Sequence, residues 1–254
     1  MDDSEFWMVG EVYNYNINNG RWFDFGDKKV DFFAQEIHSL INFGFKYDAE
    51  KDYESLFSSY SRLLHNELKG QGVLNYLSSH DDGHPFDPER NRPMEAATKL
   101  LLSPGASQIY YGDELCRPLI VDGAEGDANL RSLMDWSLIG SEDTANANKI
   151  LEHYQKLGRF RRGHPAVGAG IHQMISKEPY LFSRSYEDAS LEDLVLIGLD
   201  LEPGLKILKT GSVFKDGSEL RDAYSGWTGK VRNGQVSIDS EHGIVLLEKL
   251  EKAL

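Results

Sequence analysis

One stretch of the chain runs Val73-Leu74-Asn75-Tyr76-Leu77-Ser78-Ser79-His80-Asp81-Asp82-Gly83. It begins with the apolar and aromatic residues typical of a buried strand, and it ends in serine, histidine and aspartate. Titratable residues after a buried strand lie where the strand leaves its sheet, and in barrels of alternating strands and helices that rim carries the catalytic groups. A simple polar turn is the alternative interpretation, because Asp-Gly is a common turn dipeptide.

The first 165 residues alternate between expected strands and helices. Strands are expected over residues 6–13, 40–45, 73–79 and 106–111, and helices over residues 30–40, 52–65, 92–102 and 144–161. We expect Asp52 to cap the helix that it begins. Four such strand–helix pairs are typical of parallel βα units. Charged residues follow each strand, which predicts a single rim that gathers functional groups; they are Glu11, Lys46, Asp48, His80, Asp81, Asp113 and Glu114.

The pattern changes near residues 163–170. Short alternating segments follow, separated by turns that contain glycine, and this spacing is typical of an antiparallel all-β module. We therefore predict two domains. Residues 1–166 form the barrel-type α/β domain, and residues 167–254 form a β-sandwich.

Composition limits the partners. The 254 residues are 40% hydrophobic, enough for a real core, and carry a formal net charge of −14. This charge argues against nucleic acid and anionic membranes as partners, because both require clustered Lys and Arg. No apolar run approaches the roughly 20 residues of a membrane span. The single cysteine, Cys116, excludes an internal disulfide, and no signal peptide is expected on this chain, so the compartment stays open.

Two carboxylates, Glu11 and Asp81, are expected at the ends of two strands of one sheet, with His80 beside them. Such a pair suits acetal chemistry, in which one carboxylic acid protonates a leaving oxygen and a carboxylate stabilises an oxocarbenium-like transition state. The alternative for Glu11 is a glutamate held in a salt bridge at a strand end.

Several motifs together resemble the α-amylase family of glycoside hydrolases. Phe-Trp-Met-Val-Gly-Glu-Val-Tyr at residues 6–13 resembles the family's strand-five motif, and Tyr-Leu-Ser-Ser-His-Asp at residues 76–81 resembles its strand-seven motif. Residues 105–114 resemble the strand-eight segment, residues 131–136 the loop after it, and the all-β tail the C-terminal β-sandwich. The resemblance implies the C-terminal half of a (β/α)8 TIM barrel followed by an antiparallel sandwich. It also implies retaining hydrolysis of α-1,4-glucosidic bonds in starch, glycogen or maltooligosaccharides.

The resemblance assigns roles to individual residues. Glu11 is the expected general acid/base, and Asp81 the second carboxylate, which stabilises the transition state. His80 is expected to bind sugar hydroxyls, and Asp82 and Trp22 are predicted to contact substrate, although a lid or core role is equally open for Trp22. Ser79 departs from the family, which usually has asparagine before His-Asp.

The family's nucleophile is missing from its expected place. That aspartate lies in a Gly-Phe-Arg-x-Asp-Ala motif before the strand-five glutamate, and the ten residues before Glu11 contain no such motif. Gly-Phe-Lys-Tyr-Asp-Ala at residues 44–49 is similar, but it follows Glu11 and has Lys46 in place of arginine, so we reject Asp48 as the nucleophile. A non-catalytic glucan-binding or assembly module is therefore the alternative function.

Metals and assembly complete the predictions. The histidines show no metal-ligand spacing, so we predict no metal and no cofactor in this chain, with calcium possible in a full-length parent by the resemblance. Half a barrel leaves open strand edges and apolar faces, and we therefore predict self-association.

Overall fold

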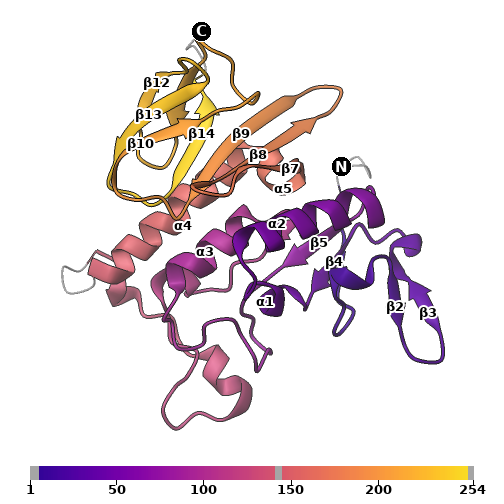
Figure 1. Ribbon diagram of the computed structural model, residues 1–254. Coiled ribbons are helices and arrows are strands. Elements are labelled where there is room, and N and C mark those ends of the chain that lie inside the picture. The colour runs from indigo at the N-terminus through magenta and orange to yellow at the C-terminus, as the bar shows by residue number, and fades with distance from the viewer. Residues whose placement is uncertain (1–5, 141–144, 251–254) are drawn as a thin grey trace. The chain divides into compact units, whose positions relative to one another are not determined.

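The computed structural model describes residues 6–140 and 145–250. The chain divides into two compact units, Met1–Gln155 and Lys156–Leu254, called here the N-terminal unit and the C-terminal unit. The boundary falls within the long helix α4 (Ala145–Gly163). Figure 1 shows the N-terminal unit in indigo to magenta and the strands of the C-terminal unit in orange to yellow.

A parallel sheet of four strands forms the centre of the N-terminal unit. Its strands are β1 (Val9–Gly10), β4 (Ser39–Asn42), β5 (Gly72–Asn75) and β6 (Ala106–Ser107), and they lie side by side in chain order. Leu40 pairs with Val73, and both side chains are fully buried. Each strand therefore lies beside its predecessor after a crossover, as parallel βα units require. This agrees with the predicted order of the four strands, although each strand is shorter than expected.

Helices α2 (Tyr53–Arg62) and α3 (Pro93–Leu102) connect these strands. Asp52 caps α2, since its carboxylate accepts hydrogen bonds from the Ser55 amide at 2.9 Å and the Ser55 hydroxyl at 2.6 Å, which confirms the predicted cap. Helix α2 continues into a π-helical turn, η4 (Leu63–Glu67). Pro93 begins α3, where its missing N–H is not needed.

The predicted helix over residues 30–40 is wrong. Strand β3 (Lys29–Asp31) pairs with β2 (Trp22–Asp24) in a hairpin that projects from the rest of the N-terminal unit (Figure 1), and only the short 3-10 helix η3 (Phe32–Gln35) follows. Asp31 caps that turn, and Glu36 ends it with a φ of 65°. The apolar residues spaced three and four apart are buried from a 3-10 turn and a strand here, and not from one face of a helix.

The predicted strand over residues 40–45 ends early, at Asn42. A short helix, α1 (Phe45–Asp48), begins three residues later, after Gly44. The remaining short 3-10 helices are η2 (Ile17–Asn19), η5 (Asp113–Leu115), η6 (Gly126–Arg131) and η7 (Trp136–Leu138).

The C-terminal unit is built from antiparallel strands, as predicted, after a short helix α5 (Pro165–Ala169) that was not predicted. Six strands form one sheet in the order β12-β11-β14-β9-β8-β7, and β10 pairs with β13 in a second. The strands are β7 (Ile171–Ser176), β8 (Tyr180–Glu187), β9 (Glu192–Leu199), β10 (Gly204–Lys209), β11 (Glu219–Asp222), β12 (Thr228–Lys230), β13 (Gln235–Ser240) and β14 (Val245–Lys249). One buried cluster joins Ile238 of the small sheet to Leu196 and Leu247 of the large one.

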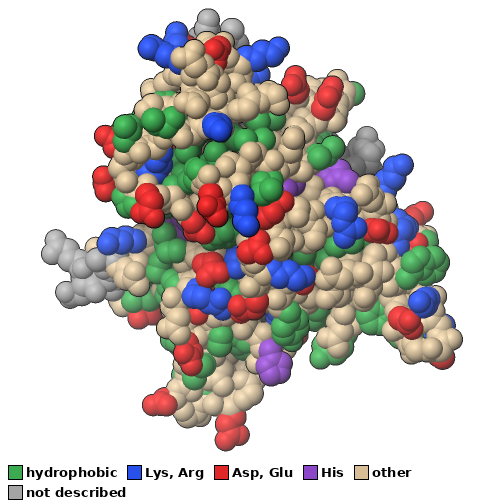
Figure 2. All heavy atoms as spheres, in the orientation of Figure 1, with side chains coloured by type: hydrophobic (Ala, Val, Ile, Leu, Met, Phe, Trp, Pro, Cys, Tyr) green, Lys and Arg blue, Asp and Glu red, His purple; other side chains and the backbone are tan. Residues whose placement is uncertain are grey.

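The surface carries both signs of charge. Acidic and basic side chains lie interspersed with hydrophobic ones on the face shown in Figure 2. Among the described residues, no helix is both long enough and apolar enough to cross a membrane.

Candidate active site

Glu11 directly follows β1, at the carboxyl edge of the parallel sheet. Its side chain is exposed and forms no ion pair with any described residue, so the salt-bridge alternative finds no support. The loop after it is fastened at several points. The Tyr15 amide donates to the Val12 carbonyl at 2.8 Å, and the Phe43 amide, just beyond β4, donates to the Tyr15 carbonyl at 2.9 Å.

His80 and Asp81 lie a few residues beyond β5. The His80 Nε2 atom is 3.5 Å from the Asp81 Oδ2 atom, and the two side chains are 65% and 48% exposed. The Ser79 hydroxyl donates to Asp81 at 3.2 Å, which gives a partner to the residue that departs from the family motif. The Arg131 Nε atom donates to the His80 carbonyl at 2.8 Å and so ties this loop to the segment at residues 131–136.

Glu11 and Asp81 therefore leave the same edge of one sheet. β1 and β5 flank β4 and all three strands are parallel, so their carboxyl ends face one side. Glu11, His80 and Asp81 are all exposed, as groups that meet a substrate from solvent must be.

Asp82 has a different environment from its neighbour. It is buried and ion-paired with Lys46, and it accepts hydrogen bonds from the Tyr76 hydroxyl at 2.7 Å and the His84 amide at 3.0 Å. Burial opposes ionisation, but these donors together outweigh it and hold the pKa of the Asp82 carboxyl below its ordinary value. The carboxylate is thus occupied by protein donors, and its predicted substrate contact stays a prediction.

Trp22 lies on the β2–β3 hairpin, with 53% of its surface exposed. It lines a depression of about 750 Å³, whose other lining residues are Asn14, Asn19, Phe23, Asp24 and Lys29. An ion pair between Arg21 and Asp31 at 2.9 Å braces the hairpin. An aromatic ring on an open, polar-lined depression has the form of a stacking surface for a flat ligand.

Asp113 organises the loop after β6. Its buried carboxylate accepts two contacts from the Ser78 hydroxyl, at 2.9 and 2.7 Å, and one from Arg90 at 2.6 Å. Asp113 therefore links the strand-eight segment to the residues just before His80. Within the described residues, no group of three or more His, Cys, Asp or Glu side chains could hold a metal ion.

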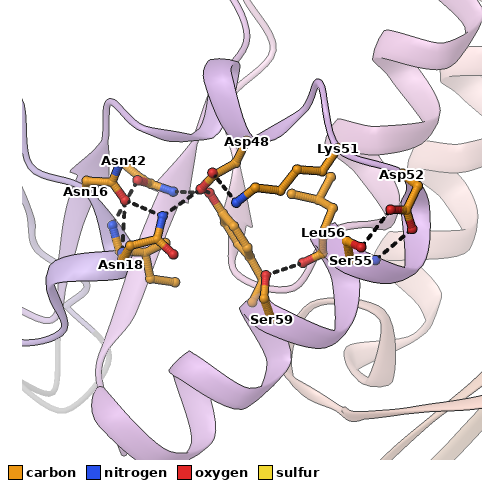
Figure 3. Close-up of polar contacts among 11 residues, drawn as sticks. Asn16, Asn18, Asn42, Asp48, Lys51, Asp52, Ser55, Leu56 and Ser59 are labelled. Atoms are coloured by element: carbon orange, nitrogen blue, oxygen red, sulfur yellow. Dashed lines mark hydrogen bonds and ion pairs between the residues drawn. The ribbon is translucent and has the colours of Figure 1, made fainter.

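Asp48, of the motif that resembles the nucleophile segment, faces a buried polar network (Figure 3). Its carboxylate accepts hydrogen bonds from the Tyr60 hydroxyl at 2.9 Å, from Asn18 at 2.9 Å and from Lys51 at 2.6 Å. Both carboxylate oxygens accept protein donors and only 7% of Asp48 is exposed, which supports its rejection as a nucleophile.

The sequence patterns do not reveal Lys46 and Arg131 as partners of the predicted site. Arg131 begins the motif at residues 131–136, which assigns the arginine no role. Lys46 is one of the charged residues expected at the rim and a substitution in the motif at residues 44–49, but neither pattern pairs it with Asp82. Their partners, Asp82 and the His80 carbonyl, lie 36 and 51 positions away, a separation that spacing along the chain does not reveal.

One curated relative is similar to most of this chain. The periplasmic α-amylase of Escherichia coli (strain K12) is 34% identical to this chain over 191 residues, which are 74% of this chain and 26% of the relative. The chain is thus similar to part of an α-amylase, a glycoside hydrolase. It spans about a quarter of the length of this α-amylase relative. No family model matches the chain.

Solved α-amylase structures share the fold. An Anoxybacillus α-amylase is 21% identical, with a TM-score of 0.60 over 99% of this chain and 54% of that one. The Geobacillus thermoleovorans α-amylase, solved with acarbose, is 16% identical, with a TM-score of 0.62 over 97% of this chain and 54% of that one. The chain thus spans about half of these α-amylase structures, and the family predicted from the motifs is confirmed.

Proposed function

We propose that this chain supplies one catalytic edge of an α-amylase-type retaining glycosidase that hydrolyses α-1,4-glucosidic bonds of starch, glycogen or maltooligosaccharides. In this proposal residues 1–166 form half of a (β/α)8 barrel and residues 167–254 form a β-sandwich. The observation that carries it is the exposure of Glu11 and of the His80–Asp81 pair at one edge of a parallel sheet.

Each exposed group has a role in this reaction. Glu11 protonates the leaving glycosidic oxygen and then deprotonates the attacking water, while Asp81 stabilises positive charge on the sugar ring. His80 hydrogen-bonds sugar hydroxyls beside Asp81, and Trp22 stacks on a sugar ring in the hairpin depression. Residues 1–10 carry no counterpart of the family's nucleophilic aspartate, so this chain provides two of the three carboxylates that retention needs.

A non-catalytic glucan-binding module is the second candidate function. One observation favours it: the carboxylate of Asp48, the aspartate of the motif that resembles the nucleophile segment, is held by protein donors. Such a module would bind maltooligosaccharides through His80 and Trp22 without cleaving them.

Product analysis with maltoheptaose separates the two candidates. Release of shorter oligosaccharides by this chain, lost by at least about 100-fold in Glu11→Gln, supports the glycosidase. The exposed Glu241→Gln in the C-terminal unit is the matched control. Maltoheptaose binding by calorimetry without any release supports the module, and the absence of both binding and release contradicts both functions.

Self-association is part of the proposal. Strand β1 lies at the edge of the parallel sheet, and large hydrophobic residues near it are exposed: Phe6 by 60%, Trp7 by 52%, Val9 by 39% and Tyr13 by 73%. Edge strands beside apolar surface favour pairing with another chain. Sedimentation velocity across a 100-fold concentration range (roughly the span needed to populate weak dimers) tests this, and a monomer throughout would contradict it.

A further inference from the structure

Residues 42–48, between β4 and the end of α1, contact two loops that the site depends on. One is the Glu11 loop, defined here as residues 11–18, and the other is the aspartate loop, residues 78–84. We propose that residues 42–48 are a positioning segment that holds these two loops in one fixed arrangement. The role of the two loops in binding sugar rests on the proposed function, whereas the contacts between them and residues 42–48 are independent of it.

The positioning segment fastens the Glu11 loop at three points. The Ile17 amide donates to Asn42 Oδ1 at 3.2 Å, and the Phe43 amide donates to the Tyr15 carbonyl at 2.9 Å. The Asn18 side-chain amide donates to Asp48 Oδ2 at 2.9 Å. Figure 3 shows the side chains of Asn18, Asn42 and Asp48 directed toward one another from separate parts of the chain. The Glu11 loop is therefore hydrogen-bonded to both ends of the positioning segment, through side chains as well as through the backbone.

Asn42 meets requirements that only a carboxamide satisfies here. Its oxygen accepts from Ile17, while its nitrogen donates to the Tyr60 hydroxyl at 3.0 Å and to Asn75 Oδ1 at 2.9 Å. Asn42 is fully buried, and an unmet polar group at such a depth is costly. A carboxylate in its place would offer oxygen lone pairs to the Asn75 oxygen, and alanine would leave the Ile17 amide without its acceptor.

The same segment holds the aspartate loop through Lys46. The Lys46 ammonium pairs with the Asp82 carboxylate, and the two side chains are only 6% and 9% exposed. Asp82 in turn accepts the His84 amide at 3.0 Å, which fixes the backbone on the far side of Asp81. Removal of the lysine would leave a buried carboxylate without its cation, so this loop depends on the pair.

Aromatic packing and one glycine complete the connection. The Phe43 ring packs edge-on against Tyr13 of the Glu11 loop, with ring centroids 5.5 Å apart, and against Tyr76, two residues before the aspartate loop, with centroids 5.8 Å apart. At Gly44, a Cβ atom would lie 2.1 Å from the Asn16 side-chain nitrogen, a distance that no side chain can occupy. Gly44 thus leaves room for Asn16, whose Oδ1 atom accepts the Asn18 amide at 2.9 Å.

These contacts give the Gly-Phe-Lys-Tyr-Asp-Ala motif a role that is not nucleophilic. The motif has two charged residues in α1, and each contacts a different loop. Lys46 is ion-paired with Asp82 of the aspartate loop, and Asp48 accepts a hydrogen bond from Asn18 of the Glu11 loop. They are positioning residues: neither is exposed toward the edge where Glu11 and Asp81 lie, and each acts through the residue that it holds.

Amide hydrogen exchange on the intact chain, measured residue by residue by NMR, tests the proposal. We expect Lys46→Met to accelerate exchange of the His84 amide by about tenfold, and Asn42→Ala to do the same at Ile17, the loss expected for one hydrogen bond. Gly44→Ala should accelerate exchange at Asn18. The control is Lys206→Met in the C-terminal unit, because Lys206 is equally buried and donates only to carbonyls there.

Maltoheptaose affinity separates positioning from simple stabilisation. Lys46→Met should weaken binding by about tenfold, and Lys46→Arg, which keeps the ion pair, should restore both affinity and His84 protection, whereas Lys206→Met should change neither. If Lys46→Met fails to fold, Gly44→Ala and Lys46→Arg still report on the two loops.

Unchanged exchange at Ile17, Asn18 and His84 in folded variants would overturn the proposal. Altered exchange with unchanged maltoheptaose affinity would also overturn it, because the segment would then hold loops that do not serve the site. If the unmodified chain binds no maltoheptaose, the proposed function fails, and the exchange measurements alone decide whether the segment holds the loops.

Discussion

The His164 Nδ1 atom lies 2.8 Å from the Asp193 carboxylate, at the start of helix α5 in the C-terminal unit. The other ring nitrogen lies 2.6 Å from Glu248 on β14, so the imidazole has a carboxylate at each end. Burial opposes the charged ring, but the two carboxylates outweigh it and raise the pKa of His164 to about 9. The second Asp193 oxygen accepts the Ala166 amide at 2.9 Å, which ties α5 to strand β9.

We expect the C-terminal unit to lose stability in mild alkali. Because the folded pKa of His164 lies above its ordinary value of 6.5, the contribution is complete below about pH 6.5 and is lost as pH rises through about 9. His164→Gln should therefore lower the free energy of unfolding by about 2 kcal/mol at pH 6 and by much less at pH 10. Urea unfolding followed by fluorescence of Trp227 measures it, and an equal loss at both pH values would contradict the expectation.

The buried Lys46–Asp82 pair should matter to folding in the acid range. The pKa of Asp82 is held below its ordinary value, so its contribution is present above about pH 4 and is lost as pH falls through the lowered folded pKa. Asp82→Asn should cost about 3 kcal/mol at pH 7, because Lys46 is then buried without its counter-charge. Denaturant unfolding of the N-terminal unit at pH 7 and pH 3 measures it. A variant as stable as the parent chain at pH 7 would show that the pair contributes nothing.

Capping of helix α2 by Asp52 should be worth about 1 kcal/mol. Asp52→Ala removes the acceptor of the Ser55 amide and should lower the free energy of unfolding by that amount, whereas Asp52→Ser should retain most of it. Thermal and urea unfolding of both variants, followed by circular dichroism, provides the measurement. Equal stability of the alanine and serine variants would mean that the cap is replaced by solvent.

Trp22 should stack on bound sugar if the hairpin depression is part of the glucan site. Trp22→Ala should weaken maltoheptaose binding roughly tenfold, the loss expected from one well-placed aromatic contact, while Trp22→Phe should keep most of the affinity. Trp136→Ala is the control, because Trp136 is 71% exposed on η7 and does not line the depression. Equal losses for Trp22→Ala and Trp136→Ala would exclude a specific role for the hairpin.

Local pattern was sufficient for the α2 cap, the order of the parallel strands and the antiparallel module. The signals for these features lie in short stretches of sequence. Asp52 accepts a hydrogen bond from the amide three residues further on, and a short apolar run indicates a buried strand. The helix expected over residues 30–40 failed for the same reason. Apolar spacing alone cannot tell one helix from the strand, turn and second strand that tertiary contacts of Phe33 and Leu40 support.

The sequence by itself was sufficient to predict the resemblance to the α-amylase family and to select Glu11, His80 and Asp81 as site residues. The reason is that motifs in a fixed order along the chain can be recognised without knowledge of the fold. Only the tertiary structure showed that Asp81 is exposed whereas the adjacent Asp82 is buried. Asp82 is buried by a lysine 36 residues earlier, and Asp48 by donors from the Glu11 loop and α2. Parallel pairing of strands brings such distant residues to one edge, so whether a carboxylate meets solvent or an internal donor depends on packing.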